Sequence, residues 1–238
     1  MTQGKKIAVI LDIVDSRQLA DRSRVQADLE RAFAVVDERT APVEPLTATV
    51  GDEFQAVYAN LTDALEATLL ARLAMPDAVD CRFGIGAGDI RPVGTGMTGI
   101  LQDGTAWWAA REAIDEAHRR ADTRVPSLRS WYRSSAGDAS AMATVNAYLL
   151  SRDHLVSAMG ARERRLALGT WLGRSQAALA AEEQISQSAV SQSLRRSGVT
   201  ALQAGMQQLR DAGAEAEAEA DADAGAGARA GVAEGAPC

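Results

Sequence analysis

The stretch Ile7-Ala8-Val9-Ile10-Leu11-Asp12-Ile13-Val14-Asp15-Ser16 is a continuous apolar run that ends among acidic residues. Uninterrupted apolar runs of this length are typical of a buried strand. A second acidic pair stands in Val50-Gly51-Asp52-Glu53-Phe54, between two further runs that we interpret as strands. Each segment places a carboxylate where an apolar strand stops. Because strand ends of one sheet can converge, the two segments predict carboxylates gathered at one end of a sheet.

Asp12 and Asp52 are the carboxylates that this arrangement would bring together. Mg²⁺ prefers one or two carboxylates together with substrate phosphates, so we predict that this pair holds one or two Mg²⁺ ions. Ile13 would add a backbone carbonyl, and Glu53 is a candidate third carboxylate. Such metals stabilise both oxygens of a phosphoryl displacement on a nucleotide triphosphate. The alternative is that Asp12 caps the end of an element and that Gly51-Asp52 is ordinary turn sequence.

The elements expected around these segments alternate between strand and helix periodicity. They are a strand over 6–14, a helix over 18–38, strands over 46–50 and 54–58, a helix over 60–75, a strand over 79–87, a glycine-rich loop over 88–104, a helix over 105–120, an edge strand over 124–132 and a helix over 139–159. This order predicts an α+β fold, in which an antiparallel sheet carries helices on one face as in ferredoxin-like and palm domains.

The charge of the chain is distributed unevenly. The whole sequence carries −7, but residues 211–238 contain seven acids and one arginine, whereas residues 161–210 contain seven arginines and three glutamates. The acidic segment 211–238 is Ala-rich with almost no bulky apolar side chain, so we predict a disordered tail. No apolar run approaches the ~18 residues of a membrane span, and we recognise no signal peptide. These features favour a cytoplasmic protein.

The segment from Gln176 to Ser197 has the pattern of a helix-turn-helix. Residues 176–183 and 187–197 are expected to be the two helices, with Ile185 and Val190 packed between them. The polar side chains expected to face outward, toward DNA bases and phosphates, are Gln187, Ser188, Ser191, Gln192, Arg195 and Arg196. Gln184 stands where glycine is usual, which predicts a strained turn. The alternative is a helical hairpin that docks a protein.

Asp12-Ile13 after a strand, the Gly51-Asp52 hairpin and the segment Arg82-Phe83-Gly84-Ile85-Gly86-Ala87-Gly88 resemble class III nucleotidyl cyclases, and Gly51-Asp52-Glu53-Phe54 also resembles the GGDEF hairpin. The whole chain resembles the SatD family, in which such a domain precedes a helix-turn-helix. The cyclase resemblance implies that the two aspartates are metal ligands, that Arg111 is the transition-state arginine and that the domain pairs as a homodimer. Trp107 and Ala48 stand where cyclases keep Asn and Lys, which argues against ordinary cyclase activity.

The predicted organisation is a nucleotidyl-cyclase-like palm domain over 1–135, a linking helix over 136–162, a helix-turn-helix domain over 163–210 and a tail over 211–238. We therefore expect a DNA-binding transcription regulator of the SatD type, whose cyclase-like domain binds metal and nucleotide or dimerises. Two alternatives stay open. One is an active Mg²⁺-dependent nucleotidyl cyclase or nucleotidyltransferase that makes a nucleotide messenger, and the other is a non-catalytic, partner-binding scaffold.

Overall fold

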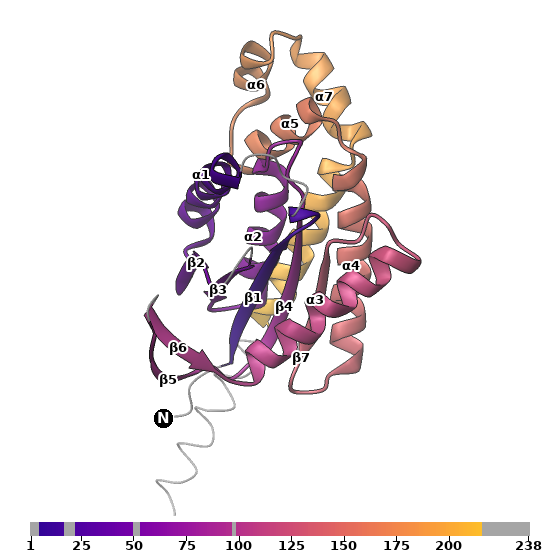
Figure 1. Ribbon diagram of the computed structural model, residues 1–238. Coiled ribbons are helices and arrows are strands. Elements are labelled where there is room, and N and C mark those ends of the chain that lie inside the picture. Colours follow the sequence, from indigo (N-terminus) through magenta and orange to yellow (C-terminus); the bar gives the residue numbers. More distant parts are fainter. Residues whose placement is uncertain (1–4, 17–21, 50–52, 97–98, 216–238) are drawn as a thin grey trace, which may run out of the picture.

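The computed structural model describes residues 5–16, 22–49, 53–96 and 99–215. Its elements are β1 (Lys6–Ile13), α1 (Arg22–Thr40), β2 (Glu44–Ala48), β3 (Glu53–Tyr58), α2 (Leu61–Ala74), β4 (Cys81–Gly88), β5 (Arg91–Gly96), β6 (Gly99–Asp103), α3 (Thr105–Thr123), β7 (Ser130–Ser134), α4 (Ala139–Ala158), α5 (Ala161–Trp171), α6 (Gln176–Glu182) and α7 (Gln187–Arg196). A last helix spans 199–215. The predicted α+β class is confirmed (Figure 1).

The central sheet has five strands in the order β2-β3-β1-β4-β7. The first four are antiparallel to their neighbours, and with α1 and α2 they follow the ferredoxin-like order that the sequence predicted. β7 adds an edge strand parallel to β4, but it spans Ser130–Ser134, whereas the sequence predicts the strand over 124–132. In this register Asp12 lies opposite Glu53 on one side and opposite Arg82 on the other. The end of β1 is therefore the place where acidic and basic side chains meet.

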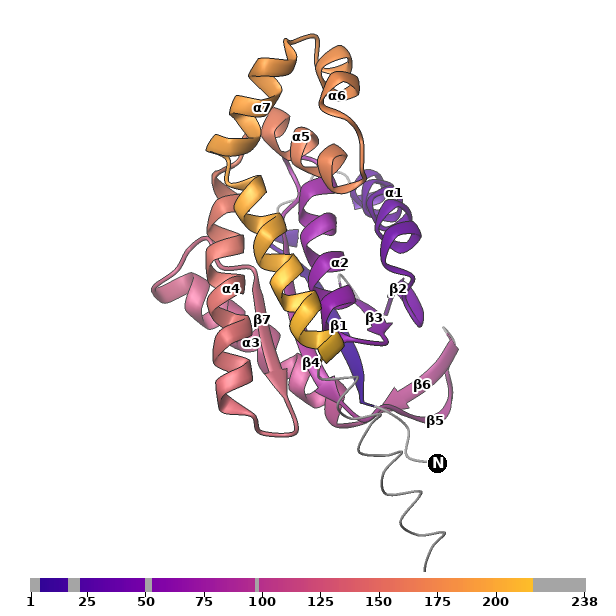
Figure 2. The ribbon, with the colours of Figure 1, turned by 180° about the vertical axis from the view of Figure 1, so that it is seen from behind.

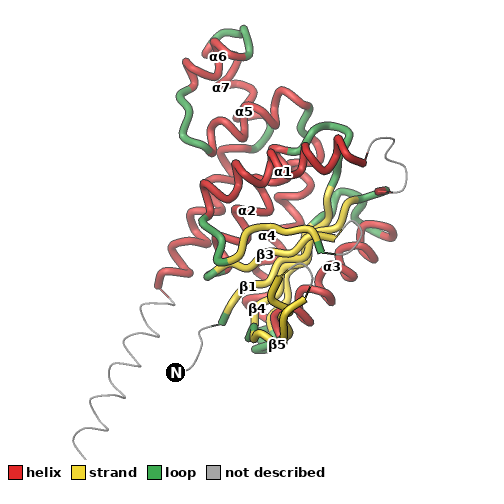
Figure 3. Tube along the Cα trace, turned by 60° about the vertical axis from the view of Figure 1, so that its left-hand side comes forward, coloured by secondary structure: helices red, strands yellow, loops and turns green. Residues whose placement is uncertain are grey.

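Helices cover both faces of the sheet, so the prediction of helices on one face is wrong. On β1, Ile7, Val9 and Leu11 belong to the main hydrophobic cluster with α1 and α2, whereas Ala8 and Ile10 pack with α3. Figure 3 shows α3 on the opposite side of the strands from α1 and α2. Strand side chains alternate between faces, and a run apolar at every position has two faces to bury.

The close approach of α3 to β4 explains the glycines of that strand. A Cβ at Gly84 or Gly86 would collide with the main chain of α3 at Ala106 and Ala110. Small residues on both sides let a helix backbone lie almost directly on a strand. The expected glycine-rich loop over 88–104 is instead largely a β-hairpin, formed by β5 and β6. β5 and β6 make a separate two-stranded sheet beside the main one.

α2 is buried on every side, because the C-terminal helices cover the part that faces away from the sheet. All ten residues from Ala64 to Leu73 are buried, and Figure 2 shows the last helix running alongside α2 and α4. Glu66 joins these layers: it accepts a hydrogen bond of 3.0 Å from the Trp171 indole and pairs with Arg210 and Arg39. The palm-like part and the C-terminal helices thus share one hydrophobic cluster.

α6 and α7 occupy the ranges that the sequence predicted for two helices joined by a short turn. Ser175 and Ser186 cap them, each accepting a hydrogen bond from a main-chain N–H of the first turn. Gln184 has φ +54°, the left-handed geometry that an L-residue adopts at a cost, as expected of this turn. Across the described part of the chain, every helix falls short of the length and apolar character needed to cross a membrane.

Candidate functional site

Two charged side chains, Asp12 at the end of β1 and Arg82 on β4, lie on the α3 side of the sheet. Asp12 continues the alternation of Ala8 and Ile10, so its carboxylate lies on that side, whereas Ile13 turns into the main core and is 8% exposed. Arg82 is the partner of Asp12 across β4, in phase with Gly84 and Gly86. Its Nη1 lies 3.5 Å from Asp12 Oδ2. The predicted metal ligand therefore has an arginine as its close neighbour.

Arg82 is the most unusual member of this group. Only 6% of the residue is exposed, and its buried Nε has no hydrogen-bond partner among the described residues. Burial lowers the pKa of the Arg82 guanidinium, and the Asp12 carboxylate opposes that shift. Leaving a buried N–H unpaired costs about 1–3 kcal/mol, more for a charged group, so an acceptor from outside the described residues would stabilise Arg82.

A cavity of about 530 Å³ opens beside Arg82, between the end of β1, the last turns of α3 and the segment before β7. Acidic and basic groups both contribute to its walls. The lining residues are Asp12, Ile13, Val14, Asp15, Ser16, Arg82, His118, Ala121, Asp122, Pro126 and Arg129. This volume lies within the range of small-molecule sites. The mixture of acidic and basic side chains suits an anionic ligand that binds together with a cation.

The far wall of the cavity is built by α3 and the segment that follows it. His118 and Asp122 lie one turn apart on α3, with Nε2 and Oδ2 at 3.1 Å. Arg129 Nε donates to Asp80 Oδ2 at 2.6 Å, and its Nη1 donates to the main-chain oxygens of Pro126 and Leu128. These contacts hold the Arg129 guanidinium in one place at the wall.

Glu53 and Arg111, the other two predicted site residues within the described chain, lie together. Arg111 Nη2 donates to both carboxylate oxygens of Glu53, at 2.8 and 2.6 Å, and Gln55 adds a third bond. The side chain of Arg111 is half exposed and that of Glu53 is 21% exposed. The arginine expected to reach a phosphate and the expected third carboxylate thus neutralise each other in one chain.

Asp52, the second predicted metal ligand, lies outside the described residues. Within the described ranges no cluster of three His, Cys, Asp or Glu residues forms a ready metal cage. The donors that remain at the cavity are hard oxygens, the Asp12 carboxylate and the main chain of Ile13, and oxygen ligands are those that Mg²⁺ takes. These oxygens fit a Mg²⁺ ion whose remaining ligands are phosphate oxygens of a bound molecule.

The cavity residues Arg82, His118, Asp122 and Arg129 were not predicted as site residues. The sequence contains one indication for Arg82, because it is the one charged residue in the otherwise apolar strand β4.

The two adjacent tryptophans lie in different environments. Trp107 packs against the α3 cluster, whereas Trp108 is 57% exposed, so one ring belongs to the core and the other to the surface.

The outer face of α7 contains the residues predicted to contact DNA. Val190 and Leu194 are buried against the rest of the C-terminal helices, and Ser191 is half-buried. The side chains that are exposed are those of Gln187, Ser188, Gln192, Arg195 and Arg196. The structure therefore presents the predicted polar face to solvent along one side of a single helix.

Ion pairs neutralise most arginines of residues 161–210 and leave the uncompensated positive charge at the end of α7. Five of the seven arginines between residues 161 and 210 pair with carboxylates of the same chain, as Arg165 does with Glu183 at 2.7 Å. In this fully described segment, Arg195 and Arg196 are the two arginines without an ion pair. Of the seven arginines counted in residues 161–210, all of which the structure describes, only these two on α7 therefore stay outside ion pairs.

The model of the SatD family matches residues 6–208 of the chain. Among solved structures the chain is similar to the catalytic core of a rhodopsin-guanylyl cyclase in complex with ATPalphaS, with 17% identity, TM-score 0.36, and 45% of this chain and 70% of that chain covered. It is also similar to adenylate cyclases from Trypanosoma brucei in their monomeric state, at 18% identity, TM-score 0.37 and coverages of 45% and 68%. No curated protein matches the chain. The family match confirms the SatD resemblance.

Proposed function

The chain belongs to the SatD family, and from this premise we propose that it is a regulatory protein that binds a Mg²⁺-bound nucleotide and DNA. The nucleotide occupies the cavity at the end of β1, and α6 and α7 act as a helix-turn-helix. The observation that carries the first part is the buried Arg82, which lines the 530 Å³ cavity and whose Nε has no hydrogen-bond partner among the described residues. A phosphate oxygen would pair with the Arg82 guanidinium, while Asp12 and the Ile13 carbonyl would hold the Mg²⁺ ion that neutralises the phosphates.

The residues of the site divide between binding and catalysis. Mg²⁺ would supply charge neutralisation, Arg82 and Arg129 would hold phosphate oxygens, and Asp52 would complete the metal ligands if the hairpin follows the cyclase resemblance. Catalysis has less support, because Arg111 is held by Glu53 and because Trp107 and Ala48 replace polar groups. Binding without efficient turnover is therefore the activity that these residues favour.

Nucleotides with Mg²⁺ are expected to raise the melting temperature of the full chain. A ligand present at a hundred times its dissociation constant adds about 2.7 kcal/mol. The substitution Arg82→Gln removes a charge-assisted bond and should weaken nucleotide binding about tenfold or more. Arg91→Gln removes an exposed arginine of β5 and serves as the matched control. Equal affinity of the Arg82→Gln variant and the unmodified chain would place the nucleotide elsewhere.

Incubating each nucleoside triphosphate with the protein and Mg²⁺ or Mn²⁺ distinguishes turnover from binding. Mass spectrometry then detects any product formed. A cyclic or oligonucleotide product that disappears in the Asp52→Ala variant would establish the cyclase or nucleotidyltransferase alternative. Product that survives this substitution comes from a contaminant. A scaffold that only binds partners predicts no effect of metal or nucleotide on melting.

The two unpaired arginines of α7 give the DNA-binding proposal its test. Phosphate contacts by arginine make affinity fall as salt rises, and the loss of each contact lowers the slope of log K against log salt by about 1. We expect Arg195→Gln and Arg196→Gln each to weaken DNA binding at low salt and to reduce this slope, whereas Arg119→Gln on α3 leaves it unchanged. The measurement is a sequencing-based selection followed by titration of the selected DNA. A homodimer, implied by the cyclase resemblance, would present two such faces.

A further inference from the structure

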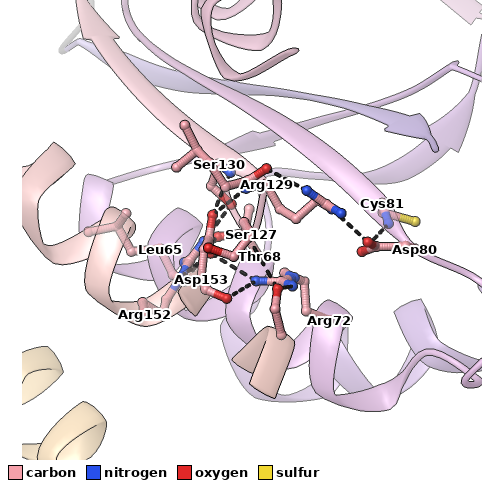
Figure 4. A network of polar contacts seen from close by, with 12 residues as sticks. Leu65, Thr68, Arg72, Asp80, Cys81, Ser127, Arg129, Ser130, Arg152 and Asp153 are labelled. Carbon is pink, nitrogen blue, oxygen red and sulfur yellow. Dashed lines mark hydrogen bonds and ion pairs between the residues drawn. The ribbon is translucent and has the colours of Figure 1, made fainter. Parts of the chain in front are cut away.

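Arg129 belongs to two environments at once. Its side chain lines the cavity, is 16% exposed and is bonded to Asp80. Its main-chain N–H points the other way and donates to Asp153 Oδ2 at 2.7 Å, next to the N–H of Ser130 on the same oxygen at 2.6 Å. A displacement of Arg129 by a ligand in the cavity therefore acts directly on Asp153, a residue of α4 (Figure 4).

Asp153 is completely buried among charged groups, so breaking its hydrogen bonds to the main chain at residues 129–130 is costly. Its Oδ1 accepts from Arg72 Nη1 at 3.0 Å and from Arg152 Nε and Nη2 at 3.1 and 3.0 Å. Arg152, also fully buried, donates in addition to the hydroxyls of Thr68 and Ser130. Breaking a buried charge network costs several kcal/mol, so these bonds tie the main chain at residues 129–130 firmly to α4.

α4 continues directly to the helices of the proposed DNA-binding part. Only Met159 and Gly160 separate it from α5. The side chain of Leu155, two residues beyond Asp153, is so close to Gly198 at the end of α7 that a Cβ there would lie 3.0 Å from both Leu155 methyl carbons. Leu155 of α4 therefore packs beside Gly198, two residues after α7 ends at Arg196.

We propose that Arg129 and Asp153 couple occupancy of the cavity to the position of α7. The coupling rests on the proposed nucleotide site, since the ligand must engage Arg129 there. Phosphate oxygens drawn to the Arg129 guanidinium compete with Asp80 and with the carbonyl oxygens of Pro126 and Leu128. Any resulting shift of the main chain at residues 129–130 is transmitted by Asp153 to α4 and then to α7.

The test is amide hydrogen exchange on the full chain, with and without inorganic triphosphate and Mg²⁺, together with the melting temperature. At saturation the exchange of α7 amides should change about fivefold or more, the size of ordinary allosteric coupling, while α1 stays unchanged. Arg129→Ala keeps the N–H bond to Asp153 but removes the side chain. It should still bind triphosphate through Arg82, more weakly than the unmodified chain, and at saturation it should lose the response of α7. Arg124→Ala, an exposed arginine in the segment before β7, should keep it.

The possible results distinguish the two proposals. A melting shift without any change at α7 rejects the coupling and leaves the nucleotide site standing. A response of α7 that persists in Arg129→Ala assigns the transmission to other residues and also rejects it. No melting shift with triphosphate or with nucleotides rejects the site and the coupling together. If Arg129→Ala lowers the melting temperature, Arg129→Lys, which keeps the charge but not the fork of donors, replaces it and should show a reduced response.

Discussion

Replacing Asp153 by alanine is expected to lower the free energy of unfolding by about 3–5 kcal/mol, the usual cost of removing one partner from a buried charge network. The substitution leaves the guanidinium groups of Arg72 and Arg152 without their shared carboxylate, and it leaves two main-chain N–H groups unpaired. Typical domains are stable by only about 5–15 kcal/mol, so the loss is a large part of the total. Urea denaturation followed by circular dichroism measures it.

Asp115→Ala is the matched control for Asp153→Ala. Asp115 is an exposed residue of α3 that makes none of these contacts, and its removal should change stability by no more than about 0.5 kcal/mol. Asp153→Asn keeps the size and one carbonyl acceptor, so its cost should fall between the two. An Asp153→Ala variant within 1 kcal/mol of the unmodified chain, on the scale of ordinary substitutions, would mean that the network carries little net energy.

A chain that ends after Gly160 is expected to lose its cooperative melting transition. This truncation removes the layer that covers α2, which is buried on every side in the full chain. The buried apolar side chains lost with it include Leu166, Trp171, Leu179, Val190, Leu194, Val199, Leu202 and Met206. Full burial of each large side chain contributes about 1.5–3 kcal/mol, so their loss together is as large as the stability of a typical domain.

A chain that ends at residue 215 is the control for this truncation, because it retains every described element and should melt like the full chain. The comparison also tests the predicted boundaries at 135, 162 and 210. Cooperative melting of the 1–160 chain would mean that the palm-like part is a domain in its own right. Failure of 1–160 with survival of 1–215 would mean that the two parts fold as one unit, as their shared hydrophobic cluster leads us to expect.

Local signals made much of the fold predictable. The caps of α2, α6 and α7 are Asn60, Ser175 and Ser186, short polar residues whose bonds involve only their own first turn. The position of Asp12 at the end of a buried strand follows from an apolar run of a few residues. Such features depend on neighbours in sequence, so the sequence displays them directly.

The candidate site was less predictable, because its residues meet through long-range contacts. Arg82 faces the cavity only because β4 pairs with β1 in one register, and Arg129 reaches it from a different segment after α3. The pairing of Arg111 with Glu53 depends on how closely α3 lies against the sheet. None of these distances has a counterpart in periodicity or local composition.

By itself the sequence determined the order of the strands and helices outside the β5–β6 hairpin, the strand-end carboxylate Asp12 and the polar face of α7, because periodicity and capping act over a few residues. The tertiary structure alone decided which charges are free to act. Ion pairs over long sequence separations neutralise most arginines of the C-terminal helices and also Arg111, while burial leaves the Nε of Arg82 without a hydrogen-bond partner among the described residues. The physical reason is that an electrostatic interaction depends on distance and burial in space, and sequence position specifies neither.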